Sequence, residues 1–224
     1  MSSKLLLSIF ILFVSFSLHG EFTVLIDPGH GGNNKGAVGG GIEEKDLTLE
    51  LALKLKSFFK KHRPPNIKVI FSRSTDEDLP IKKRAEMIEK IKPDLFLSLH
   101  FNSQKFLTTN RGFEIYYPAD ELDKPSREMA KKYDRANRSF YYGKTFQDLY
   151  FKANIHTTWK LPFNLFTQKY NLRLFDETTV PGLLLEIAYL TSPEDRACIE
   201  HKEFVADIAW YIYDAIKKIS KKKR

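Results

Sequence analysis

The feature that most constrains this chain is a glycine-rich hexapeptide at residues 27–32, DPGHGG, directly after an apolar segment at residues 22–26. A short apolar run rich in β-branched residues is typical of a buried strand, and the Pro-Gly pair ends it. His30 therefore stands at the carboxyl end of a strand, where the flanking glycines allow a ligand to approach the backbone closely. Open α/β sheets bind ligands at such strand ends, so the hexapeptide predicts both a fold class and a site.

A second histidine, His100, ends another strand-like segment at residues 94–99. Either histidine alone is more often a partly buried structural residue than a ligand. Two histidines at two strand ends, together with a carboxylate, indicate a His₂Glu zinc site with water as the fourth ligand. Glu43 and Glu44 precede the first expected helix and are the candidate carboxylates, although a carboxylate there also stabilises the helix dipole.

One further carboxylate lies inside an apolar segment. Glu186 interrupts the apolar run at residues 181–190. A buried carboxylate is unfavourable unless it is paired, coordinated or neutral. Desolvation raises its pKa toward the range that suits general acid–base catalysis, so Glu186 is the candidate catalytic base. Pairing with a lysine is the alternative interpretation.

The order of the expected elements predicts an α/β fold. The expected strands are residues 22–26, 67–71, 94–99, 112–117 and 183–188. Two helices are expected to be capped by Asp46 and Asp78, and a last helix is expected at residues 204–216. Strands and helices that alternate at these spacings are typical of βαβ units and a mainly parallel sheet.

Residues 118–180 fit this alternation less well. They contain two expected helices, at residues 126–138 and 145–156. At 224 residues the chain is long enough for one well-packed domain. We therefore expect a single domain with a mainly parallel, twisted sheet flanked by helices. Residues 118–180 form a partly helical insert before the last strand, either a flap over the site or a regulatory segment.

The first twenty residues differ in kind from the rest. Lys4 precedes an uncharged apolar stretch at residues 5–16, which is short for a membrane span. This pattern predicts a secretory signal peptide at residues 1–20 and a mature domain at residues 21–224. Residues 18–20 match the usual cleavage pattern poorly, so an uncleaved membrane anchor is the alternative. We expect export, to the periplasm or to the cell wall and extracellular space.

The formal net charge of +8 favours anionic partners. Cell-wall polymers, lipid headgroups and nucleic acid share that chemistry, but export makes nucleic acid the weakest candidate. We therefore expect no nucleic-acid partner, and we expect membrane contact only if the first segment stays uncleaved. Cys198 is the single cysteine, which excludes an internal disulfide.

Four motifs in a fixed order connect the chain to a known family. They are DPGHGG at residues 27–32, Glu44-Lys45, SLHFN at residues 98–102 and LLEIAYLTSP at residues 184–193, with lesser matches at residues 71–76 and 112–114. In these motifs the chain resembles the zinc-dependent N-acetylmuramoyl-L-alanine amidases of the cell-division and spore-cortex type, over roughly residues 24–216. It departs from the family pattern at Ala188, Tyr189 and Ser192, where the family usually has Gly, Phe and Asn.

The resemblance implies a Zn²⁺ ion held by His30, Glu44 and His100. Glu44 is preferred to Glu43 because only Glu44 is followed by lysine, as in the family's Glu-Lys pair. The resemblance further implies hydrolysis of the amide bond between N-acetylmuramic acid and L-alanine in peptidoglycan. Glu186 is then the catalytic general acid and base that acts on a zinc-bound water.

Two supporting roles and one regulatory role are also implied. Asp27 can hold a histidine tautomer, and Asn102 can orient the substrate or a zinc ligand. In this family a helix can block the zinc until a protein activator displaces it. Glu121 and Glu128 are candidates for a blocking carboxylate, and a solvated helix face is the alternative.

Two other functions remain open from the sequence. One is a zinc peptidase or deacetylase that acts on a related cell-wall substrate. The other is a non-catalytic wall-binding protein of the same fold, against which the four intact residues His30, Glu44, His100 and Glu186 argue.

Overall fold

The structure is a computed structural model that describes residues 20–104, 110–118, 127–167 and 172–221, the side chains of residues 127–133 and 165–167 excepted. Six described strands form one sheet in the order β4-β1-β5-β8-β6-β7. Their bounds are β1 (Phe22–Pro28), β4 (Ile67–Phe71), β5 (Leu95–Asn102), β6 (Phe113–Tyr117), β7 (Phe163–Thr167) and β8 (Gly182–Tyr189). The strands β4, β1, β5 and β8 run parallel, β6 is antiparallel to β8, and β7 is parallel to β6.

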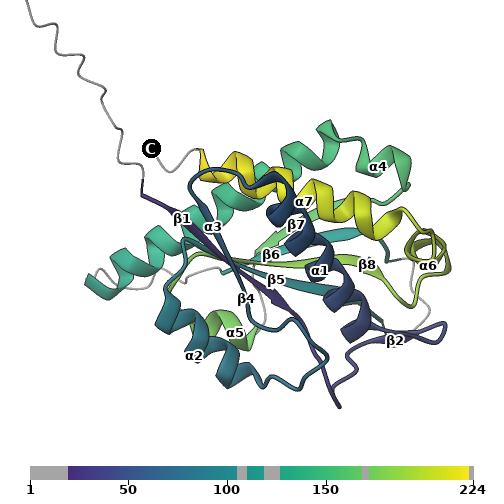
Figure 1. Ribbon diagram of the computed structural model, residues 1–224, viewed down its shortest axis with the longest axis horizontal. Helices are drawn as coiled ribbons and strands as arrows, with labels where there is room; N and C mark the ends of the chain where they lie inside the picture. Colours follow the sequence, from purple (N-terminus) through teal and green to yellow (C-terminus); the bar gives the residue numbers. More distant parts are fainter. Residues whose placement is uncertain (1–19, 105–109, 119–126, 168–171, 222–224) are drawn as a thin grey trace, which may run out of the picture.

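Helices cover both faces of the sheet (Figure 1). One face packs against α1 (Glu44–His62), α3 (Arg127–Lys152) and α7 (Phe204–Ser220), and the other against α2 (Ile81–Ile91) and α5 (Arg173–Asp176). The remaining described elements are short: α4 (Ile155–Thr158), α6 (Pro193–Ile199) and the hairpin of β2 (Val38–Gly39) and β3 (Ile42–Glu43). The predicted single α/β domain with a mainly parallel sheet is confirmed.

The central strands are apolar because the sheet is buried on both faces. In β1, Val24 and Ile26 face the core under α1 and α7, whereas Leu25 faces the core under α2. All three side chains are fully buried. Continuous apolar runs of this kind are what parallel sheets require.

Two helix starts were predicted wrongly. Glu43, not Asp46, is the N-cap of α1, and Pro80, not Asp78, is the N-cap of α2. Neither N-cap residue makes a side-chain capping hydrogen bond. The extended backbone of Pro80, φ −61° and ψ 148°, instead sets where α2 begins.

The secondary structure of the insert at residues 118–180 differs from the prediction. The expected helices at residues 126–138 and 145–156 are one helix, α3, because proline is absent from residues 127–152 and the apolar spacing continues. Phe146 and Tyr150 of α3 are fully buried in the main core. The strand β7, in the same region, was not predicted. Glu121 and the side chain of Glu128 lie outside the described residues, so regulation by this segment stays a prediction.

Within the described residues, no helix combines the length and the apolar composition that a membrane crossing requires.

Candidate metal and catalytic site

The loop that carries His30 is held by two buried arginines. His30 has a left-handed backbone, φ 58°, which is uncommon for a residue other than glycine. Arg84 donates to the carbonyl oxygen of Pro28 at 2.7 Å and to that of His30 at 2.6 Å. Arg73 donates to the carbonyl oxygen of Gly29 at 2.8 Å. Three successive carbonyls are therefore fixed by guanidinium groups, and they fix the direction in which the imidazole points.

Asp27 acts on this loop through Arg84. Its carboxylate pairs with the Arg84 guanidinium at 2.5 Å and also accepts hydrogen bonds from the hydroxyls of Ser72 and Ser98. The expected contact between Asp27 and a histidine ring is not found among the described residues. The residue at Nδ1 of His30 is Asn34, whose Oδ1 lies 2.9 Å away. The sequence analysis did not single out Asn34, which lies two residues after the DPGHGG hexapeptide.

The carboxylate of Glu44 lies between the two histidines. Its Oε2 is 3.0 Å from Nε2 of His30, and its Oε1 is 2.8 Å from Nδ1 of His100. The backbone N–H groups of Ala37 and Phe101 donate to the same carboxylate at 2.7 and 3.1 Å. Burial alone would raise the pKa of Glu44, but the hydrogen bonds of the two histidines outweigh burial and lower it. Glu44 is therefore an anion in this site.

The neighbouring Glu43 faces elsewhere. Its carboxylate pairs with Lys35 at 2.5 Å and lies 3.7 Å from Lys45. Of the two candidate carboxylates, Glu44 contacts the histidines and Glu43 contacts the lysines.

The donor set fits a zinc ion. The ligand atoms of His30, Glu44 and His100 all lie within 4.8 Å of one another. Two glycines permit this close approach, because a Cβ on Gly29 would lie 2.3 Å from the His100 ring and one on Gly36 would lie 2.4 Å from Oε2 of Glu44. Two imidazoles and one carboxylate leave a fourth position of a tetrahedral zinc ion open, as catalytic zinc sites require.

Glu186 lies beside this donor set, in β8. It is in register with His100 of β5 on one side and with Glu114 of β6 on the other. Laterally paired residues project from the same face of a sheet, so the three side chains form a row. Within the described part of the chain, the buried Oε2 of Glu186 has no hydrogen-bond partner. Burial raises the pKa of Glu186 well above its usual value, and the charges of Glu44 and Glu114 add to this effect.

Glu114 has the opposite surroundings. It is 5% exposed and accepts from the Tyr189 hydroxyl at 2.9 Å, the Tyr116 hydroxyl at 2.9 Å and the Asn102 amide at 3.2 Å. The described side-chain partner of the Asn102 amide is Glu114, and the expected role of Asn102 toward substrate or a zinc ligand stays a prediction. The argument that singled out Glu186, an acidic residue in an apolar strand, applies equally to Glu114.

A comparison with known proteins places these residues in a family. Residues 24–218 match the family model Amidase_3, described as N-acetylmuramoyl-L-alanine amidase. The chain belongs to this amidase family. The resemblance inferred from four motifs is therefore confirmed, and the match spans both histidines, both site carboxylates and the insert.

Individual amidases agree with this assignment. The chain is 26% identical over 246 residues to the probable N-acetylmuramoyl-L-alanine amidase AmiB of Haemophilus influenzae, covering 96% of this chain and 56% of that protein. It is 26% identical over 220 residues to the germination-specific amidase of Bacillus subtilis, covering 90% and 81%. The solved amidase from Clostridium difficile 630 superposes with a TM-score of 0.70 at 26% identity, covering 92% of this chain and 100% of that chain. The chain thus spans little more than half the length of the Haemophilus relative.

The departure from the family pattern at Tyr189 has a local explanation in the structure. The family usually has phenylalanine here, whereas the Tyr189 hydroxyl is the donor to Oε1 of Glu114. The extra hydroxyl of Tyr189 is therefore satisfied by Glu114 on the neighbouring strand β6. Burial and the bond to Glu114 together raise the pKa of Tyr189, so its hydroxyl stays a donor.

Proposed function

We propose that this chain is a zinc-dependent hydrolase that cleaves the amide bond between N-acetylmuramic acid and L-alanine in peptidoglycan. The observation that carries the proposal is that Glu186 lies beside His100 in the sheet. Its buried Oε2 has no hydrogen-bond partner among the described residues. The His30–Glu44–His100 donor set supports the metal assignment. Membership of the amidase family supports the choice of substrate.

The roles of the side chains follow from their surroundings. A zinc ion on His30, Glu44 and His100 would supply a Lewis acid toward water and the amide carbonyl. Glu186 would accept a proton from water at Oε2 and return it to the leaving nitrogen of L-alanine. Its raised pKa suits this exchange, because an acid–base group works best when its pKa lies near the working pH.

We also propose that the protein is exported and acts in the periplasm or cell wall. The signal-like pattern of residues 1–20 and the family's peptidoglycan substrate support this location. Relief of inhibition by a protein activator stays a prediction, because the candidate carboxylates lie outside the described side chains.

Mass spectrometry of digested peptidoglycan tests the reaction. All described strands and helices lie between Phe22 and Ser220, so a chain of residues 21–224 retains each of them. We expect this chain, loaded with zinc, to release free stem peptides that begin with L-alanine. A chelator should stop the release, and zinc should restore it. Shortened peptides would indicate a peptidase instead, and deacetylated glycan would indicate a deacetylase. Unchanged muropeptides would contradict the proposal.

A further inference from the structure

The edge of the sheet opposite the site carries a concentrated basic surface. We name this surface the basic pole and define it by six residues: Lys60, Lys61, Arg63, Lys217, Lys218 and Lys221. Five of these side chains are exposed and Lys217 is half-buried. The sequence continues with three more basic residues at 222–224, outside the described part.

The two helix ends of the basic pole lie together. The ring of Tyr213 on α7 is 4.9 Å from that of Phe59 and 5.5 Å from that of His62, both in the last turn of α1. Lys217 follows one turn later, with its Nζ 5.3 Å from the Tyr213 ring. The last turns of both helices therefore form one surface.

This surface lies where β1 begins. The backbone N–H of Phe22 donates at 2.8 Å to the carbonyl oxygen of Asn66, which lies three residues after Arg63, the C-cap of α1. Figure 1 shows the end of α7 on the same side of the molecule as the start of β1. Residue 20 thus leaves the domain at the basic pole, and the zinc ligands lie at the other ends of the strands.

The positive charge of the basic pole is mostly not neutralised. Lys217 lies 3.6 Å from Asp214. Among the described residues, no ion pair forms at the other five cations of the pole. Unpaired cations on one face attract an anionic surface over distances near the Debye length.

Aromatic side chains extend the basic pole. Trp210 is 46% exposed, and its ring centroid lies 5.4 Å from that of Phe58 and 5.3 Å from that of His62. Tryptophan combines an apolar ring with a polar N–H and concentrates at membrane–water interfaces. A soluble polyanion would use the lysines but would gain little from an exposed indole beside them.

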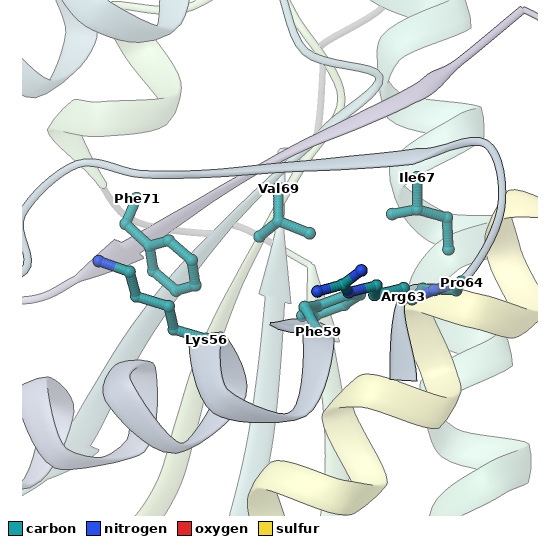
Figure 2. Close-up of a pocket in the computed structure, with 7 residues that line it drawn as sticks. All are labelled: Lys56, Phe59, Arg63, Pro64, Ile67, Val69 and Phe71. Atoms are coloured by element: carbon teal, nitrogen blue, oxygen red, sulfur yellow. The ribbon is translucent and has the colours of Figure 1, made fainter. Parts of the chain in front are cut away.

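A groove on the other side of α1 adds apolar surface (Figure 2). Ile67, Val69 and Phe71 point from the edge strand β4 toward α1, and Lys56 and Arg63 stand at the rim. The Nζ of Lys56 lies 5.9 Å from the Phe71 ring centroid. An apolar wall with cations at its rim suits an amphiphile that has an anionic headgroup.

We propose that the basic pole binds the surface of an anionic phospholipid bilayer, with Trp210 at the interface. Charge complementarity and the exposed indole give the chemistry. The apolar stretch at residues 5–16 joins the domain at this pole, so a membrane holding that stretch would meet the same surface. The catalytic edge would then face away from the bilayer, toward the wall. This inference goes beyond the proposed function and does not depend on it.

Vesicle flotation with the chain of residues 21–224 tests the proposal without the apolar stretch. We expect binding to vesicles of phosphatidylcholine with phosphatidylglycerol, little binding to phosphatidylcholine alone, and release by salt. Bromine-labelled phosphatidylglycerol should quench tryptophan fluorescence in the wild type but not in Trp210→Gln, since Trp159 is the only other tryptophan.

Matched variants separate the basic pole from net charge. The pole variant carries Lys60→Gln, Lys61→Gln, Lys218→Gln and Lys221→Gln. The control loses the same charge from exposed lysines elsewhere: Lys82→Gln, Lys83→Gln, Lys152→Gln and Lys202→Gln. We expect the pole variant to bind phosphatidylglycerol vesicles at least about tenfold more weakly and the control to bind as the wild type does. Thermal unfolding verifies that both variants are folded.

Three outcomes would overturn the proposal. They are no binding to phosphatidylglycerol vesicles, equal losses in both variants, and equally tight binding to soluble polyphosphate that Trp210→Gln leaves unchanged.

Discussion

Two glutamates at the same edge of the sheet differ in the donors around them. Glu44 accepts from two histidines and from two backbone N–H groups. The buried Oε2 of Glu186 has no hydrogen-bond partner among the described residues, and two other carboxylates lie near it. The pKa of Glu44 is accordingly lowered, whereas that of Glu186 is raised.

The difference shows that donors, rather than burial alone, decide what a carboxylate can do. Surrounded by donors, Glu44 is a fixed anion and is suited to hold a metal ion. Glu186, whose buried Oε2 has no donor among the described residues, is suited to exchange a proton. The following variants alter either Glu186 and its neighbours or the loop that carries His30 beside Glu44.

The largest expected effect is on catalysis. Glu186→Gln keeps the shape of the side chain but cannot accept the proton. We expect the rate of stem-peptide release to fall about 10²- to 10⁴-fold, measured as initial rates on purified peptidoglycan. The matched control is Glu43→Gln, which alters a carboxylate that faces two lysines and should keep nearly the wild-type rate. Unchanged turnover in Glu186→Gln would remove its assigned role.

The next largest effect is on stability and concerns the loop that carries His30. Arg84→Met leaves the buried charge of Asp27 without its cation and removes the Arg84 donors to the carbonyls of Pro28 and His30. The Pro28 carbonyl keeps a hydrogen bond from Arg73 at 3.1 Å. We expect the free energy of unfolding in urea to fall by about 3–5 kcal/mol. The double variant with Asp27→Asn should recover part of this loss, since it removes the unpaired charge.

Lys83→Met, on the exposed face of the same helix, is the control for the Arg84 experiment. It should change stability by less than about 0.5 kcal/mol. If Arg84→Met lowers the free energy of unfolding by no more than this control does, Arg84 does not hold the loop.

A smaller effect concerns stability on the Glu186 side. The pKa of Glu186 is higher in the folded protein than in the unfolded chain. The free energy of unfolding therefore falls as the pH rises above the pKa of the unfolded chain. In the metal-free protein, Glu186→Gln should raise the free energy of unfolding at pH 7 by about 1.4 kcal/mol for each unit by which burial raises the pKa, counted no further than pH 7. At pH 4 the two proteins should be nearly equal. A destabilised variant at pH 7 would mean that Glu186 is paired as an anion.

The smallest expected effect is on stability and concerns the hydrogen bonds to Glu114, the neighbour of Glu186 in the sheet. Tyr189→Phe restores the residue that the family usually has and removes one of three donors to Glu114. We expect a loss of about 1 kcal/mol in the free energy of unfolding, with Tyr116→Phe as the matched removal at the other oxygen. A gain in stability would show that the Tyr189 hydroxyl is not satisfied by Glu114.

The sequence predicted the strand ends of the site well. His30 and His100 follow apolar runs whose period and bounding residues are local properties, and the structure brings both to one edge with Glu44. The fold class followed from the same runs. Helix starts were less predictable, because Glu43 and Pro80 cap α1 and α2 without a side-chain hydrogen bond.

The parts that could not be predicted depend on contacts between distant segments. Asp27 and Arg84 are 57 residues apart, and so are Glu44 and Phe101. The surroundings of Glu114 come from three strands whose order in the sheet the sequence did not specify. That order places Glu114 beside Glu186 and directs Asn102 to Glu114 rather than to a histidine.

The most direct test of the comparison is the zinc content of three purified proteins, measured by elemental mass spectrometry. The wild type and Glu186→Gln should each hold about one zinc ion per chain, and Glu44→Gln should hold far less. Loss of zinc from Glu186→Gln, or full zinc in Glu44→Gln, would contradict the division of roles between the two carboxylates.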